Sequence, residues 1–142
     1  MFKPDNITLP EELFEEAKEV HEYLKIGYNV DSGKECSDRA AELGGLMART
    51  GKMLADSKYH KDELLKSEIM DLLKKQLQEH LTPATINKLV DSACKDYNYL
   101  VNWITEIDKE CKYQMELMRT FISQAKEMNR NANYSSMQNK QP

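Results

Sequence analysis

Residues 82–128 read TPATINKLVDSACKDYNYLVNWITEIDKECKYQMELMRTFISQAKEM, and this stretch decides the fold. Thr82 can cap a helix, Pro83 fits the first turn, and no further Gly or Pro follows before the last residue. Alternating steps of four and three residues from Ile86 meet thirteen positions, of which twelve are apolar or aromatic. Such a heptad seam predicts one unbroken, coiled-coil-like helix over residues 83–130. The seam consists of Ile86, Val90, Ala93, Tyr97, Leu100, Ile104, Ile107, Cys111, Gln114, Met118, Phe121, Ala125 and Met128.

A second long helix is predicted over residues 33–80. Ser32 and Glu35 have the spacing of a capping box, and no proline lies between them and Pro83. The polar stretch ADSKYHKDE interrupts the apolar pattern and leaves open a kink or short loop near residues 57–62. One face carries small residues at helical spacing, which predicts close packing against another helix, because glycine in a helix costs about 1 kcal/mol relative to alanine. These small residues are Ser37, Ala41, Gly45, Ala48, Gly51 and Ala55.

A shorter first helix is predicted over residues 9–27. Thr8 and Glu11 have capping-box spacing, and Pro10 is tolerated in the first turn. An apolar stripe is formed by Leu13, Ala17, Val20 and Leu24. The other faces carry the acids Glu11, Glu12, Glu15, Glu16, Glu19 and Glu22. The stripe predicts that this helix packs on the others through one side.

These elements predict an all-α protein built as a long antiparallel helical hairpin with the shorter N-terminal helix packed on it. Each long helix of about 47 residues would span roughly 70 Å at 1.5 Å per residue. We expect one helical domain over residues 1–130 and a disordered tail over residues 131–142, which lack apolar periodicity. A rod this slender buries little surface for its mass, so we also expect a homo-oligomer.

Composition agrees with this architecture and excludes several other classes. The chain has 142 residues, 40% of them hydrophobic and 31% charged, with only five Gly and four Pro, which disfavours turn-rich all-β folds. No apolar run reaches the ~18–20 residues that a membrane span needs, and the first residues show no targeting pattern. The three cysteines lack CxxC spacing, which is typical of a reducing compartment. We therefore expect a cytoplasmic protein.

The sequence contains no pattern that predicts an enzyme, a metal or a cofactor. The three histidines are far apart, and no ExxH pair occurs on any predicted helix. The stretch LGGLMARTGK lacks the preceding strand and the Ser or Thr after GK that a phosphate-binding loop requires. Cys111 falls on the seam and Cys94 beside it, where a thiol behaves as a small hydrophobic side chain. No small-molecule substrate is indicated.

The charge distribution points to an anionic partner near the C-terminus. Residues 1–30 carry seven acids and three bases, whereas residues 109–142 carry six bases and three acids. The predicted nucleic-acid contacts are Lys112, Arg119, Lys126 and Arg130 on one helix face, assisted by Lys58 and Lys61. One monomer offers few such contacts, so a ring of subunits would be needed to multiply them. Ordinary solubilising charge is the alternative interpretation of these residues.

The order of motifs resembles that of a known family. A short acidic helix is followed by LGGLMARTGKMLADSKYHKDELL, the turn LTPATI and the helix DYNYLVNWITEIDKECKYQMELMRTFISQAKEM. Over about residues 35–130 this resembles the T4-type recombination mediators, small helical proteins that tailed phages encode beside their recombination genes. The shared features are Leu81 and Thr82 leading into a long helix, Ile86 one turn in, the acids Asp91 and Asp96, and Arg119 near the end.

The resemblance implies an oligomeric phage or prophage accessory protein that binds single-stranded DNA and assists a strand-exchange or annealing protein in recombination or replication. The net charge of −4 is unlike that of a strongly basic DNA-binding protein. The alternative hypothesis is therefore a protein–protein interaction adaptor or structural hairpin of a phage, in the virion or against host defence, that binds no nucleic acid.

Overall fold

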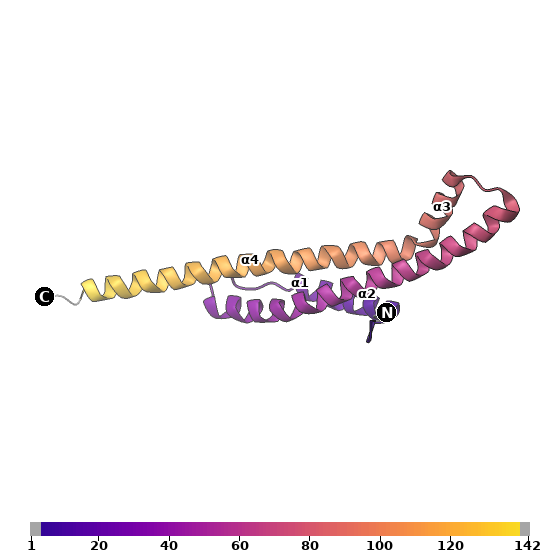
Figure 1. Cartoon of the computed structure of the whole chain (residues 1–142). Coiled ribbons are helices and arrows are strands. Elements are labelled where there is room, and N and C mark those ends of the chain that lie inside the picture. Colours follow the sequence, from indigo (N-terminus) through magenta and orange to yellow (C-terminus); the bar gives the residue numbers. More distant parts are fainter. Residues whose placement is uncertain (1–3, 140–142) are drawn as a thin grey trace.

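The computed structural model describes residues 4–139, and within them every regular element is a helix (Figure 1). In chain order the helices are α1 (Pro10–Lys25), α2 (Gly33–Glu79), α3 (Pro83–Ala93) and α4 (Lys95–Gln138). The two long helices α2 and α4 lie side by side and run antiparallel, and α1 lies against both. The predicted all-α hairpin with a shorter N-terminal helix is confirmed.

Contacts along the hairpin fix its register. The hydroxyl of Thr50 on α2 donates to the carboxylate of Asp108 on α4 at 2.7 Å, and the ring of His60 stacks on that of Tyr97 with centroids 6.4 Å apart. Later residues of α2 therefore face earlier residues of α4, as an antiparallel pair requires. Helix α1 runs parallel to α4 and covers about residues 97–114 of it.

The predicted seam forms the centre of the core. Its six consecutive positions from Leu100 to Met118 are all buried, whereas its last position, Met128, is 72% exposed. The apolar stripe of α1 packs on the same core, as the buried side chains Leu13, Ala17 and Val20 show. Heptad spacing thus identified the buried face of α4 correctly, over the length that α1 and α2 cover.

A buried arginine ties the end of α1 to both long helices. Arg39 on α2 is 5% exposed, and its Nη2 donates to Gln114 Oε1 at 2.8 Å and to the backbone carbonyls of Tyr23 and Leu24 at 3.3 and 3.5 Å. Its guanidinium also lies 4.2 Å from the ring centroid of Tyr23 and 5.2 Å from that of Tyr28. No carboxylate within residues 4–139 pairs with it, so the C-terminal carbonyls and dipole of α1 and the two aromatic rings stabilise its charge.

The prediction of one unbroken helix over residues 83–130 is wrong at Cys94. There the backbone leaves α-helical geometry, with φ −89° and ψ 1°, and α3 turns away from the axis of α4 (Figure 1). Cys94 is buried at this corner. Helix α3 contacts the end of α2 without a buried residue of its own, and its residues Ile86, Val90 and Ala93 are half-buried. No Gly or Pro marks the break, so no local pattern in the sequence predicted it.

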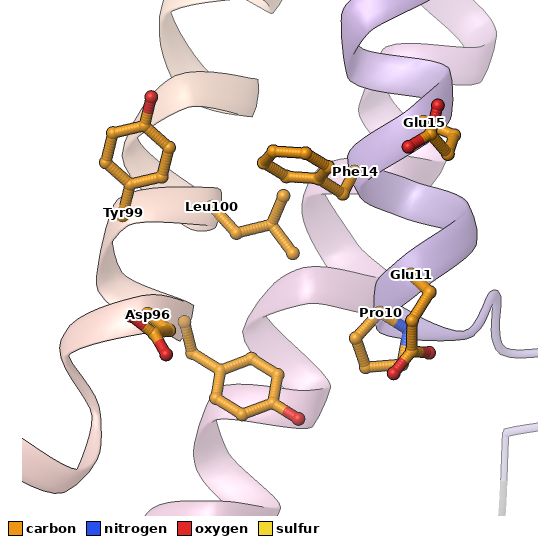
Figure 2. A pocket seen from close by; sticks show the side chains of 8 residues that line it. Pro10, Glu11, Phe14, Glu15, Asp96, Tyr99 and Leu100 are labelled. Carbon is orange, nitrogen blue, oxygen red and sulfur yellow. The ribbon is translucent and has the colours of Figure 1, made fainter.

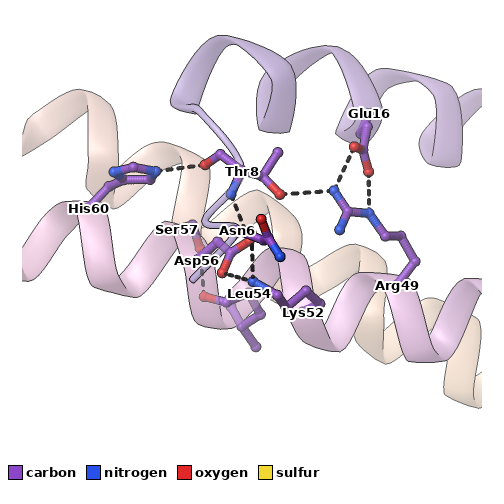
Figure 3. Close-up of polar contacts among 9 residues, drawn as sticks. All are labelled: Asn6, Thr8, Glu16, Arg49, Lys52, Leu54, Asp56, Ser57 and His60. Atoms are coloured by element: carbon purple, nitrogen blue, oxygen red, sulfur yellow. Dashed lines mark hydrogen bonds and ion pairs between the residues drawn. The ribbon is translucent and has the colours of Figure 1, made fainter. Parts of the chain in front are cut away.

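The interruption left open near residues 57–62 does not occur, since α2 is continuous from Gly33 to Glu79. The N-terminal segment lies against this polar stretch and bonds to two of its side chains, Asp56 and His60 (Figure 3). The backbone N–H of Thr8 donates to Asp56 Oδ2 at 3.0 Å, and His60 Nε2 donates to the carbonyl of Thr8 at 2.7 Å. The polar pattern marks this contact with the N-terminal segment rather than a loop.

The same contact explains why the capping box predicted at Thr8 and Glu11 is wrong. The N-cap of α1 is Leu9, which makes no side-chain cap. The Thr8 hydroxyl instead accepts a hydrogen bond from Arg49 at 3.1 Å, and Arg49 also pairs with Glu16 (Figure 3). The caps predicted at Ser32 and Thr82 are confirmed, because each hydroxyl accepts from the N–H three residues on.

The segment 131–142, predicted as a disordered tail, belongs to α4 as far as Gln138. Helix α4 continues to Gln138, and residues 140–142 lie outside the described residues. Residues 131–138 contain no Gly or Pro that would end a helix already nucleated by the core. This end of α4 projects past the start of α2, and its side chains from Lys126 onward are exposed (Figure 1).

The small residues of α2 do not pack against another helix of the chain. All six residues of the stripe from Ser37 to Ala55 are exposed. A Cβ added at Gly45 or Gly51 would meet no atom within 4 Å. The expected close approach is therefore wrong for the single chain. Gly45 and Gly51 therefore make α2 less stable than alanine would, and no contact within residues 4–139 offsets this loss.

Alanine at both exposed glycines is expected to stabilise the fold. The double variant Gly45→Ala/Gly51→Ala should raise the free energy of unfolding by about 1–2 kcal/mol, because each alanine restricts the unfolded chain and favours the helix. Urea denaturation followed by circular dichroism measures this change. Gly33→Ala is the control with a smaller gain, since a Cβ there would lie 3.3 Å from the Cβ of Ala125. A destabilised double variant would contradict the solvent exposure of this face.

The three cysteines lie in the core, as predicted for Cys94 and Cys111. All three are free and buried. Burial, with the nearby acids Asp108 and Glu110, raises the pKa of Cys111 to about 11, so its thiol stays protonated and unreactive.

Among residues 4–139, no helix combines the length and apolar character needed to cross a bilayer.

Candidate nucleic-acid interface

The C-terminal part of α4 carries three predicted cations without an acidic partner, and Lys58 and Lys61 on α2 also form no ion pair within residues 4–139. Arg119, Lys126 and Arg130 are exposed, and none forms an ion pair within residues 4–139. Steps of seven and four residues place the three on one side of the helix. We call Arg119, Lys126 and Arg130 the α4 basic row. The structure brings these predicted residues together along one helix face.

A groove beside the row adds a cation that the sequence patterns did not single out. The groove has a volume of about 420 Å³ and lies where the start of α2 meets α4, lined among others by Lys34, Ser37, Lys126 and Asn129. Asp31 also lines it and opposes their charge. Lys34 comes directly after the first residue of α2, so it sits at the positive end of the helix dipole. Only the antiparallel register places Lys34 beside Lys126, which is why heptad spacing within α4 could not find it.

Lys112, by contrast, has a structural partner. Its Nζ lies 2.8 Å from Asp108 Oδ2, and the other oxygen of this buried carboxylate accepts from the Thr50 hydroxyl. Burial alone would raise the pKa of Asp108, but the hydrogen bonds from Lys112 and Thr50 outweigh it and lower that pKa. The charge of Lys112 is therefore largely neutralised by Asp108, although its side chain remains accessible.

Lys58 and Lys61 lie far from the α4 basic row. They are on α2 beside His60, whose ring faces Tyr97 near the start of α4. From Tyr97 to Lys126 the helix advances roughly 44 Å at 1.5 Å per residue. Lys58 is exposed and Lys61 half-buried. The two predicted basic patches thus occupy different parts of the rod and cannot form one compact site within a single chain.

Acidic side chains limit the positive potential around the row. Glu116 and Glu127 are exposed on α4 near Arg119 and Lys126, and Glu35 and Asp38 are exposed at the start of α2. Since affinity for nucleic acid grows with the number of phosphates that are neutralised, one chain with three or four free cations supports weak binding only. No group of three or more potential metal ligands is present in the part of the chain that the structure describes.

Acid is expected to weaken the contact of α2 with α4, through Asp108, and the contact of α2 with the N-terminal segment, through Asp56. Hydrogen bonds lower the pKa of Asp108 and of buried Asp56, although burial opposes the shift at each carboxyl. Both carboxylates therefore stabilise the fold above the unfolded pKa of about 3.9, and that stabilisation is lost as the pH falls further through the folded values. Thermal unfolding between pH 7 and pH 2.5 should show Tm falling below about pH 4.

The double variant Asp56→Asn/Asp108→Asn provides the check on this acid dependence. It should be less stable at pH 7 and should lose less Tm on acidification than the natural chain. Glu106→Gln/Glu127→Gln removes two exposed carboxylates and should keep the natural pH profile. An unchanged profile in the Asp56 and Asp108 variant would show that other groups cause the acid sensitivity.

Comparison with known proteins adds no functional assignment. No protein-family model matches the chain, and neither curated proteins nor solved structures gave a significant match. The fold and the site define the class as a helical hairpin with a cationic row at one end. Any function must accordingly be inferred from the chain's own residues.

Proposed function

We propose that this chain is a non-enzymatic, oligomeric accessory protein of a phage or prophage that binds single-stranded DNA weakly. It would act in the cytoplasm of the bacterial or infected cell and assist a strand-exchange or annealing protein in recombination or replication. The α4 basic row would contact phosphates, with Lys34 alongside it and Lys112, Lys58 and Lys61 in secondary roles. Oligomerisation would place several rows on one strand.

One observation carries the proposal: Arg119, Lys126 and Arg130 are exposed along one helix face and form no ion pair within residues 4–139. The row begins where α4 pairs with the start of α2 and ends where α4 projects past it. A cation that is already paired with a carboxylate of the same chain is not free to neutralise a phosphate. The exposed cations of the row can neutralise phosphates and so release the counterions condensed on DNA. Arg130 lies beyond the position where the start of α2 meets α4, so the phosphate backbone can approach this end of the row without clashing with α1 or α2. The order of motifs that resembles the recombination mediators supports the same function.

Anisotropy of a fluorescein-labelled oligothymidylate, titrated with the protein at several salt concentrations, tests this proposal. We expect binding at low salt that weakens as salt rises. Arg119→Gln/Lys126→Gln/Arg130→Gln should reduce the magnitude of the slope of log K against log salt by about 2, since each single-strand phosphate contact contributes about 0.7. Single-stranded rather than duplex binding is checked with the annealed oligonucleotide.

The matched control is Lys74→Gln/Lys75→Gln/Lys88→Gln. It removes the same charge from exposed positions at the opposite end of the hairpin and should leave the slope nearly unchanged. No binding by the natural chain at low salt would reject the proposal. Equal loss in the two triple variants would reject the α4 basic row as the site.

A second candidate function, a protein-interaction adaptor, is favoured by exposed apolar side chains at the α2–α3 end. Ile69, Met70 and Leu73 of α2 and Leu89 of α3 are each 42–54% exposed. Such a patch on a slender rod is typical of an interface, and association of copies through it would also supply the proposed oligomer. Sedimentation analysis of Ile69→Glu/Leu73→Glu should then show a smaller assembly than the natural chain. An unchanged mass would exclude this patch as the interface between copies.

A further inference from the structure

A cleft between α1 and α4 lies at the opposite end of the three-helix section from the α4 basic row. Its volume is about 520 Å³, and Phe14 of α1, Tyr97, Tyr99 and Leu100 of α4 supply its apolar walls. In Figure 2, Phe14 and Leu100 reach toward each other from the two helices. The cleft exists because α1 runs parallel to α4, so that the starts of both helices lie together.

The charged groups that line the cleft are all acidic. Glu11 and Glu15 come from α1 and Asp96 from α4, and no lysine, arginine or histidine lines it. Figure 2 shows Glu11 and Asp96 on opposite sides of the same end of the cleft. Neither of these two carboxylates has an ion-pair partner within residues 4–139, whereas Glu15 pairs with Lys18 at 3.3 Å.

An intramolecular contact already shows the chemistry that suits this wall. The ammonium of Lys18 lies 4.6 Å from the ring centroid of Phe14 and also pairs with Glu15. A cation held by an aromatic ring and a carboxylate is thus part of the structure at the edge of the cleft. Inside the cleft, Tyr97, Tyr99 and the carboxylates of Glu11 and Asp96 offer the same combination of groups, and no lysine, arginine or histidine lines it.

We propose that this cleft binds an arginine side chain from a basic segment of another protein. A guanidinium is planar, stacks on aromatic rings and donates to carboxylates in a fixed fork, so it fits Phe14 and Tyr97 together with Glu11 and Asp96 better than an ammonium does. Nucleic acid is excluded as the occupant, since phosphates would be repelled by the three carboxylates. This protein contact is independent of the proposed DNA contact and uses a different end of the rod.

The single tryptophan makes the proposal measurable. Trp103 packs edge-on against Phe14 with ring centroids 5.4 Å apart and lies 6.1 Å from Tyr99, so its fluorescence reports on the aromatic wall. Titration of the full chain with tri-arginine amide at low salt should give a saturable change in Trp103 emission. Tri-lysine amide should bind more weakly, and tri-alanine amide should give no change.

Glu11→Gln/Asp96→Asn should weaken tri-arginine binding at least about tenfold, because charge-assisted hydrogen bonds are lost. Both residues are exposed and unpaired, so this variant should fold as the natural chain does. Glu12→Gln/Glu19→Gln removes the same charge from α1 outside the cleft and should change the binding constant less than twofold. DNA binding by the α4 basic row should be no weaker in either variant.

Three results would overturn the proposal. The first is the absence of a saturable change with tri-arginine amide. The second is an equal loss in both double variants, which would show non-specific attraction to acidic α1. The third is a Trp103 emission that shifts when the protein alone is concentrated and that Lys126→Gln/Arg130→Gln abolishes, since a second copy would then occupy the cleft.

Discussion

Replacing Ile104 by alanine is expected to lower the free energy of unfolding by about 2–5 kcal/mol, the largest effect of any single truncation considered for this fold. Ile104 is completely buried in the cluster where α1, α2 and α4 meet, beside Leu13, Met53 and Ile107. Truncation removes three buried carbon atoms. It also leaves a cavity, because the three packed helices cannot move close enough together to fill it. Chemical denaturation with tryptophan fluorescence and circular dichroism measures the loss.

Ile26→Ala is the matched control, because the same side chain is 59% exposed at the end of α1. It should change the free energy of unfolding by less than about 0.5 kcal/mol. Similar effects of the two substitutions would mean that the three-helix section does not form the core. Comparison of the two therefore tests the position of α1 on the hairpin.

Replacing Arg39 by methionine is expected to cost about 2–4 kcal/mol, although methionine keeps most of the apolar volume. The substitution leaves Gln114 Oε1 without its buried donor and removes one of the two donors to each of the Tyr23 and Leu24 carbonyls. It also removes the stacking on Tyr23 and Tyr28. Hydrogen exchange of the α1 amides should accelerate more than that of α4, because the lost contacts hold the end of α1.

Arg119→Met serves as the control for Arg39. It removes the same group from an exposed position and should change stability by less than about 0.5 kcal/mol while weakening binding to single-stranded DNA. Arg39→Met should lower stability and leave binding to single-stranded DNA unchanged for as long as the protein remains folded. If both variants lost only stability, Arg119 would have a structural partner that is absent from the described contacts.

The parallel packing of α1 on α4 separates the acidic and the basic surfaces of the protein. In the sequence, acids concentrate in the first 30 residues and bases in the last 34. The structure places the acidic cleft at the start of α4 and the α4 basic row near its end, so the two charged surfaces are separated along the rod. A protein contact at one and a DNA contact at the other could then form at the same time.

Local patterns predicted the helices and their buried faces, since helix periodicity and caps depend on neighbours within a few residues. The seam from Leu100 to Met118, the stripe of α1 and the caps at Ser32 and Thr82 follow directly from such spacing. The candidate cations Arg119, Lys126 and Arg130 were found in the same way, because seven- and four-residue steps fix a helix face.

Only the tertiary structure decided the features that join distant segments. The break at Cys94, the contact of Thr8 with α2, the pairing of Lys112 with Asp108 and the solvent exposure of the small-residue stripe depend on which helix lies opposite, and no local spacing encodes that choice. The same holds for Arg39 and for the cleft lined by Glu11 and Asp96. The sequence by itself therefore determined an all-α hairpin and the polar character of its ends. The packing of α1 and the N-terminal segment on α2 and α4 decided which polar groups are buried and which remain available to partners, because the burial of a group depends on the surface that lies opposite it.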